Sequence, residues 1–203
     1  CVVNPRACHE TELIYRPTQA KKRIAVVGGG PAGLSFTAVA AERGHAVTLY
    51  EKSAELGGQF NLAKRIPGKQ EFGESVAYYA ERLRRAGVTV VLNHAANDAE
   101  LKEYDEVVLA SGIAPRTPAI PGVEHKMVAG YVDVLSGRVP VGERVVILGA
   151  GGIGFDVALY LLEKNGKVQV EAQAFASHWG IVTDAISAGG LAAEQPHDAK
   201  PAH

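Results

Sequence analysis

A glycine turn between a short strand and a helix constrains this chain more than any other feature. Residues 23–27 form an aliphatic run, the pattern Gly28-x-Gly30-x-x-Gly33 follows, and an Ala-rich apolar stretch leads to a second aliphatic run that ends at Glu51. This order of strand, glycine turn, helix and strand predicts a mononucleotide-binding βαβ unit. Glycines in the turn let a pyrophosphate approach the backbone, where free amides of the helix start would face it.

The acidic residue at the end of the second run strengthens this prediction. Glu51 stands 18 residues after Gly33. An acidic side chain in this place accepts hydrogen bonds from the ribose hydroxyls of a dinucleotide. The glycine spacing alone would be a weak signal, but strand, helix, second strand and terminal Glu together favour a dinucleotide site over an ordinary turn.

The opening pattern recurs 121 residues later. Residues 144–148 predict a strand, Gly149-x-Gly151-x-x-Gly154 repeats the glycine spacing, and residues 155–164 predict an apolar-faced helix. Two such turns predict two dinucleotides, and the economical pairing is a flavin with a nicotinamide that reduces it. FAD is then expected at the first turn and the nicotinamide at the second, the alternative being a second turn that binds nothing.

The residues between the two turns predict the rest of an α/β domain. Apolar residues recur with helical spacing over residues 69–86, and short aliphatic runs at residues 88–92 and 105–112 predict strands. Residues 98–103 predict a helical turn. We therefore expect a three-layer α/β domain with a parallel sheet over residues 23–118.

A second domain is expected after a proline-rich crossing. Three prolines between residues 113 and 122 predict a stiff connection to a domain over residues 127–203. Residues 167–171 are its candidate second strand, and the chain closes with a tail of disordered composition. Two strands and one helix cannot bury both faces of a parallel sheet, so this domain is expected to be truncated. Residues 1–22 predict a leader laid over a surface.

Charge and hydropathy argue against several classes of partner. The chain has 21 basic and 22 acidic residues with no long run of one sign, which gives no electrostatic footprint for nucleic acid or an anionic membrane. Its apolar runs are far shorter than the roughly 18 residues of a membrane span, and no signal pattern opens the chain. A cytoplasmic protein that binds small molecules is expected. No nucleophile and base can be paired, so no catalytic residue is predicted.

Longer strings of residues extend beyond the two glycine turns. They are Cys1-Val-Val-Asn-Pro-Arg-Ala-Cys8-His-Glu, Gly57-Gly58-Gln59-Phe60-Asn61, Ile66-Pro-Gly-Lys69, Ala110-Ser-Gly112 with Pro115-Arg-Thr-Pro118, and Gly149-x-Gly151-Gly-Ile-Gly-Phe-Asp156. With these strings the chain resembles, over nearly its whole length, the bacterial NADPH-dependent 2,4-dienoyl-CoA reductases. These are iron–sulfur flavoproteins of the old-yellow-enzyme and trimethylamine-dehydrogenase superfamily.

The resemblance implies a place for the chain in a longer enzyme. In that family a barrel with FMN reduces an enoyl thioester, a four-iron, four-sulfur cluster relays electrons, and two Rossmann-like domains bind FAD and NADPH. The chain would be the electron-input part, with the FMN barrel missing from it along with the segment that closes over FAD. It is not expected to complete a catalytic cycle alone. The alternatives are a related enzyme that acts on another enone or an amine, and a non-catalytic dinucleotide-binding module.

The resemblance also implies roles for single residues. Cys1 matches the last of the four cluster ligands, Cys8 matches none, and Arg65 is expected near the flavin. The expected FAD contacts are Gly28, Gly30, Pro31, Ala32, Gly33, Glu51, Lys52, Gly58, Gln59, Arg65, Ser111 and Gly112. The expected contacts of the nicotinamide dinucleotide are Gly149, Gly151, Ile153 and Gly154.

Overall fold

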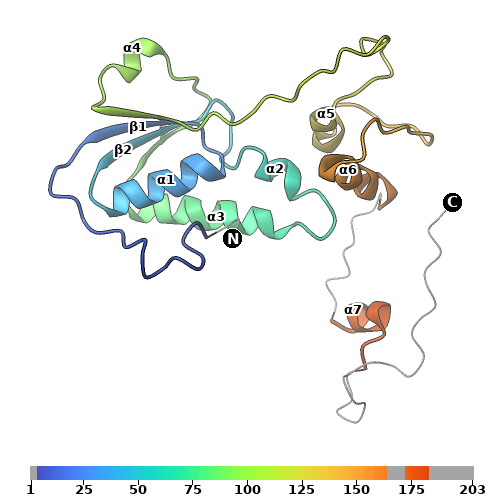
Figure 1. Ribbon diagram of the computed structural model, residues 1–203, viewed down its shortest axis with the longest axis horizontal. Coiled ribbons are helices and arrows are strands. Elements are labelled where there is room, and N and C mark those ends of the chain that lie inside the picture. The colour runs from blue at the N-terminus through green and yellow to red at the C-terminus, as the bar shows by residue number, and fades with distance from the viewer. Residues whose placement is uncertain (1–3, 164–171, 183–203) are drawn as a thin grey trace. The chain divides into compact units, whose positions relative to one another are not determined.

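The computed structural model describes residues 4–163 and 172–182 (Figure 1). The chain divides into a first unit, Cys1–Leu161, and a second, Leu162–His203. In the second unit the described residues include helix α7 (Ala172–Trp179), whose Phe175 and Trp179 rings lie 6.2 Å apart. The predictions for Cys1, for a strand at residues 167–171 and for the C-terminal tail fall outside the described residues.

Four strands of the first unit form a parallel sheet, which confirms the predicted α/β class. They are β1 (Arg23–Val27), β2 (Ala46–Tyr50), β3 (Thr89–Val91) and β4 (Glu106–Leu109). Their order across the sheet is β3-β2-β1-β4, and every neighbouring pair is parallel. The register places Ile24 beside Val47 and Val26 beside Leu49, so these four side chains share one face.

Helices α1 (Pro31–Glu42) and α3 (Glu71–Arg85) cover that face (Figure 1). Both were predicted from the sequence, and their apolar residues meet the strands to form the main core. Burial of such side chains is the dominant stabilising term, at about 25 cal/mol for each Å² removed from water. The core side chains are Ile24, Val26, Leu34, Ala38, Ala40, Val47, Leu49, Tyr79 and Leu83.

The opposite face of the sheet carries the segment around helix α4 (Asp98–Leu101) (Figure 1). Tyr50 of β2 points to this side, and its hydroxyl lies 2.8 Å from that of Tyr104. This hydrogen bond, together with burial, raises the pKa of Tyr50 to about 12. Asn97 caps α4 and forms a reciprocal capping box with Glu100, which explains why so short a helix begins there.

The chain beyond β4 differs from its prediction. The strand predicted over residues 144–148 is wrong, because these residues form no strand in the structure, and Val146 is 85% exposed. A parallel strand is held by hydrogen bonds to its neighbours, and the sheet formed by the described residues ends at β3 and β4. Helix α6 (Gly152–Leu162) does form and begins three residues earlier than predicted.

Two further short helices lie between these elements. Helix α2 (Phe60–Ala63) precedes α3, and helix α5 (Tyr131–Ser136) precedes α6. A second, smaller core joins them around the buried Ile66, Leu135 and Val157. Among the described helices, none has the length and apolar character needed to cross a membrane.

Replacement of Gly33 by Ala should destabilise the fold. A Cβ at Gly33 would overlap the carbonyl oxygen of Gly28 and lie 3.4 Å from the Cβ of Ala110. We expect Gly33→Ala to lower the free energy of unfolding by about 1–3 kcal/mol, the usual cost of overpacking, as measured by urea denaturation. Gly142→Ala is the control, because a Cβ there meets no atom within 4 Å. Equal stability of the two variants would contradict the prediction.

Candidate dinucleotide site

The first glycine turn brings the ends of two strands and the start of α1 together. Gly28 has φ +115°, and its amide donates to the carbonyl of Tyr50 at 2.8 Å. A Cβ at Gly28 would overlap the carbonyl oxygen of Ala110, at the end of β4. Gly33 in turn packs against the Gly28 carbonyl, so α1 approaches the sheet closely. Both positions therefore require glycine, as the sequence pattern predicts.

Gly30 differs from these two glycines because the space that a side chain would occupy there is open. A Cβ at Gly30 would meet no atom within 4 Å, and its φ of −76° is one that any residue adopts. No side chain caps α1, so the amides of Ala32 and Gly33 have no acceptor within the helix. The positive end of the helix dipole thus faces an open space, which suits a pyrophosphate.

Glu51 lies buried behind the turn with both carboxylate oxygens in use. It is 7% exposed, Oε2 accepts from the Gly29 amide at 2.7 Å, and Oε1 accepts from the Ser53 amide at 2.8 Å. Burial is the largest single influence on the Glu51 pKa and raises it, but the amides of Ser53 and Gly29, with the Ser53 side chain and the Lys52 charge, hold the pKa below 4.5. Each carboxylate oxygen retains a second lone pair that could accept from a ribose hydroxyl.

A second pair of glycines packs against the first turn. Gly57 and Gly58 have φ values of +119° and +52°, and the Gly57 amide donates to the Gly29 carbonyl at 2.8 Å. A Cβ at Gly58 would lie 3.1 Å from the Cα of Gly30. The structure therefore brings the predicted Gly58 to the open side of the first turn, where its backbone can approach a ligand.

Asn61 has a structural role beside the Gly57–Gly58 pair that was not predicted from the sequence. Its Nδ2 donates to the Leu56 carbonyl at 2.8 Å, and its side chain fills the space beside Gly57. Lys64 Nζ donates to the Asn61 Oδ1 at 2.9 Å. A side-chain amide close after a Gly-Gly pair is the signal that could have indicated this support for the turn.

The other predicted FAD contacts divide into two groups. Ser111 and Gly112 follow β4 at the same edge of the sheet as the first turn, and Lys52 is exposed directly after Glu51. Two others contact α5 instead of the turn. The Tyr131 hydroxyl donates to Gln59 Oε1 at 3.3 Å, and Arg65 donates to the Leu135 carbonyl at 2.8 Å. A flavin contact for Gln59 and Arg65 stays a prediction.

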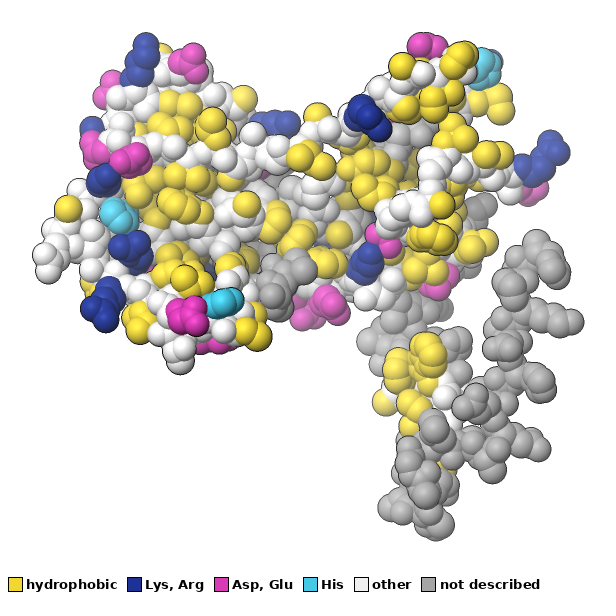
Figure 2. All heavy atoms as spheres, in the orientation of Figure 1, with side chains coloured by type: hydrophobic (Ala, Val, Ile, Leu, Met, Phe, Trp, Pro, Cys, Tyr) yellow, Lys and Arg dark blue, Asp and Glu magenta, His cyan; other side chains and the backbone are white. Residues whose placement is uncertain are grey.

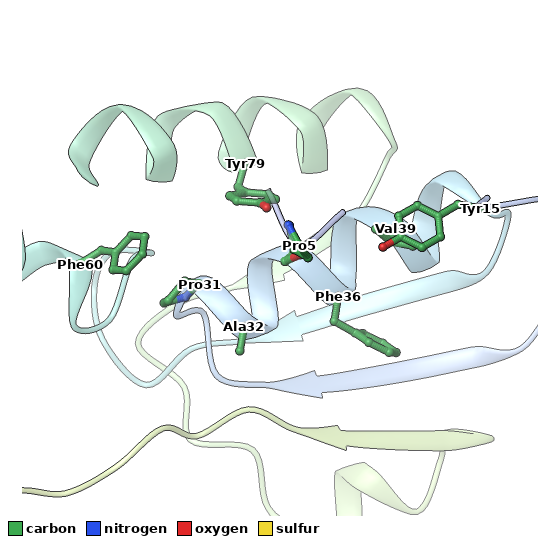
Figure 3. A pocket seen from close by; sticks show the side chains of 9 residues that line it. Pro5, Tyr15, Pro31, Ala32, Phe36, Val39, Phe60 and Tyr79 are labelled. Atoms are coloured by element: carbon green, nitrogen blue, oxygen red, sulfur yellow. The ribbon is translucent and has the colours of Figure 1, made fainter. Parts of the chain in front are cut away.

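An apolar hollow of about 470 Å³ lies beside the start of α1. Figure 3 shows Pro31 and Ala32 of α1 on one side of it, with Phe60, Tyr79 and Pro5 from other parts of the chain. No pattern in the sequence predicts this hollow directly. The signal in the sequence is the presence of large apolar residues on the side of α1 that faces away from the sheet, such as Phe36, which is 40% exposed.

The second glycine turn repeats the backbone of the first. Gly149 has φ +115°, the value found at Gly28. A Cβ at Gly154 would overlap the carbonyl oxygen of Gly149, just as Gly33 packs on Gly28. The predicted turn therefore forms, and α6 starts from it in the same register as α1 starts from the first turn.

The predicted contacts of the second dinucleotide are open to solvent. No atom lies within 4 Å of a Cβ built on Gly149 or Gly151, and Ile153 is half exposed. The Phe155 amide donates to the Gly151 carbonyl at 3.1 Å, which begins the hydrogen bonding of α6. This turn has the backbone that a phosphate group can approach.

The described residues contain no group of three or more His, Cys, Asp or Glu that could hold a metal ion. The predicted cluster ligand Cys1 lies outside those residues, and Cys8 is a free, exposed thiol. Basic and acidic side chains are interspersed over the face of the molecule drawn in Figure 2.

The chain is similar to parts of much longer proteins. A cinnamate reductase of Clostridium sporogenes is 37% identical over an alignment of 206 positions, which covers 98% of this chain and 29% of that protein. An NADH oxidase of Thermoanaerobacter brockii is 42% identical over 180 residues, which cover 84% of this chain and 27% of that protein. The chain thus spans less than a third of the length of these relatives.

A solved structure and a family match agree with the fold. The complex of 2-naphthoyl-CoA reductase with 2-naphthoyl-CoA superposes with a TM-score of 0.77 at 36% identity, over 81% of this chain and 26% of that one. Residues 22–176 match the family described as pyridine nucleotide-disulphide oxidoreductase. Because this match includes both glycine turns and most of the chain, the chain belongs to the pyridine nucleotide-disulphide oxidoreductase family.

Proposed function

We propose that the chain is the electron-input part of a flavin-dependent oxidoreductase, where it binds FAD at the first glycine turn and NAD(P)H at the second. The family implies these two cofactors. The observation that carries the proposal is the presence of two glycine turns with one backbone conformation, of which the first lies against a buried acid. Bound together, the two dinucleotides would supply hydride transfer from a nicotinamide to a flavin.

The residues of the first turn suit FAD in three respects. Gly30 leaves room for a pyrophosphate, and the amides of Ala32 and Gly33 are free to donate to it. Glu51 is held in place by two amides and is ionised at neutral pH, so it can accept from ribose hydroxyls. Gly58 and the small residues after β4 let the rest of the cofactor pass close to the backbone.

The longer strings of residues that resemble the 2,4-dienoyl-CoA reductases support a narrower function. We propose a 2,4-dienoyl-CoA reductase-like enzyme in fatty-acid β-oxidation in the cytoplasm. NADPH would be the electron donor, and an iron–sulfur cluster that includes Cys1 would lead to an FMN domain of the same polypeptide. Two observations support this narrower proposal. The relatives include a reductase named for an acyl-CoA, and each of them is more than three times as long as the part that the chain covers.

FAD binding by the 203-residue chain is the direct test. We expect titration with FAD to quench the flavin fluorescence and to saturate at one site. Anaerobic NADPH should then reduce the bound flavin in a protein that also contains the remaining length of the relatives. A chain that binds no FAD would contradict the proposal. Bound FAD that dithionite reduces and NADPH does not would leave FAD binding intact and contradict the role in electron input.

Replacement of Glu51 by Gln should weaken FAD binding. The variant keeps the shape of the side chain but removes its charge and one of its acceptors, and a hydrogen bond to a charged group is worth enough to change affinity about tenfold or more. We expect this loss in the dissociation constant for FAD measured by fluorescence titration. Glu55→Gln is the matched control, because Glu55 is an exposed acid of the same loop. Equal losses in both variants would assign the effect to overall charge.

Glu51 should also make the stability of the chain depend on pH. Because its pKa in the folded chain lies below 4.5, the ionised group contributes stability that is complete above about pH 4.5 and is lost as the pH falls through the folded value. We expect the free energy of unfolding, measured with urea, to fall less in Glu51→Gln than in the wild type as the pH is lowered from about 6 to about 3. Parallel curves for the two proteins would show that the Glu51 pKa is not lowered.

A further inference from the structure

Residues 57–69, called here the connecting segment, contact the first glycine turn and the helix that starts from the second. At its start, the Gly57 amide donates to the Gly29 carbonyl at 2.8 Å, beside the first turn. At its end, Lys69 Nζ lies 2.7 Å from both carboxylate oxygens of Asp156. Asp156 belongs to α6, the helix that starts from the second turn. Two strings singled out in the sequence, Ile66–Lys69 and Gly149–Asp156, therefore meet through this ion pair.

The middle of the connecting segment packs into the smaller core. Ile66 is 1% exposed and packs with Leu135 of α5 and Val157 of α6, the residue that follows Asp156. Arg65 donates to the Leu135 carbonyl at 2.8 Å. Because Ile66, Leu135 and Val157 are buried, the segment and α6 meet in a packed junction and not only through a surface ion pair. Movement of α6 relative to the connecting segment would have to break the junction.

The Lys69–Asp156 ion pair fixes the register of that junction. The two side chains are 41% and 30% exposed. For a pair with this exposure we expect an effect of up to about fivefold on the equilibrium between two placements of α6. One ammonium group contacts both carboxylate oxygens, and a charge reversal at either residue therefore places two like charges together. Reversal at both residues restores the attraction with the positions exchanged.

We propose that the connecting segment is a positioning element that couples the two dinucleotide sites, with the Lys69–Asp156 ion pair as its contact on the second. The proposal rests on the function proposed above and deepens it. A ligand that orders the first turn also orders Gly57 and Gly58, and through Ile66 and Lys69 it favours one placement of α6. Ligand at the second turn favours the same placement, so each dinucleotide raises the affinity for the other by the same factor.

The coupling is measured as the ratio of FAD dissociation constants without and with saturating NADP⁺, the oxidised form, which transfers no hydride. In the 203-residue chain we expect a ratio of about five. The variants Lys69→Glu and Asp156→Lys should each lower the ratio to below about two, and the double variant should restore it. FAD affinity without NADP⁺ should change less than about twofold in all of them, since neither residue touches the first turn.

A matched control is the ion pair between Arg138 and Asp133, with 2.8 Å between Nη2 and Oδ1 and similar or greater exposure of both side chains. Neither residue belongs to the connecting segment or to α6, so Arg138→Glu should leave the ratio unchanged. Lys69→Gln serves as a second variant if charge reversal prevents folding, as judged by urea denaturation. It should lower the ratio without placing like charges together.

The outcomes separate this inference from the proposed function. A ratio of one in a wild-type chain that binds both FAD and NADP⁺, or a ratio that survives Lys69→Glu, Lys69→Gln and Asp156→Lys, overturns the inference and leaves the proposed function standing. A lowered ratio in Arg138→Glu also overturns it, because any surface charge would then have the same effect. A chain that binds no FAD, or no NADP⁺, overturns both.

Discussion

The close contact between Gly33 and the carbonyl of Gly28 is the constraint on which the rest of the structure depends. It allows α1 to lie directly on the end of β1, and the positive φ of Gly28 lets the turn pass under the end of β4. The start of α1, the end of β2 and the residues after β4 therefore meet at one edge of the sheet. Parallel α/β sheets bind their ligands at this edge, because strand ends and helix starts face it together.

Glu51 shows how one residue serves stability and binding through the same hydrogen bonds. Its carboxylate is buried, which is costly for a charge, and the amides of Gly29 and Ser53 offset that cost. The bond from Gly29 joins the first turn to the end of β2, and the two bonds together fix the orientation of the carboxylate. A side chain that is already ordered loses little conformational entropy when a ligand binds, so the site is organised before any cofactor arrives.

The parts of this fold that were predicted from sequence are those with local signals. The βαβ unit, α3 and the two glycine turns follow from periodicity and glycine spacing over a few residues. The strand predicted at residues 144–148 was wrong although its aliphatic run resembles that of β1, since a strand exists only where a neighbour supplies hydrogen bonds. The contact of Arg65 with Leu135 was equally inaccessible, because 70 residues separate the two in the sequence. The local sequence patterns therefore predict the candidate sites but not the contacts that join them.

The second turn explains why such long-range contacts matter for function. Its backbone matches that of the first turn even though no strand forms before it, so glycine spacing alone is enough to shape the turn. Local shape says nothing about where α6 points, and hydride transfer depends on the placement of one dinucleotide against another. That placement has to come from residues outside the turn. Ile66 and Lys69 supply it by fixing α6 to the segment that also packs on the first turn.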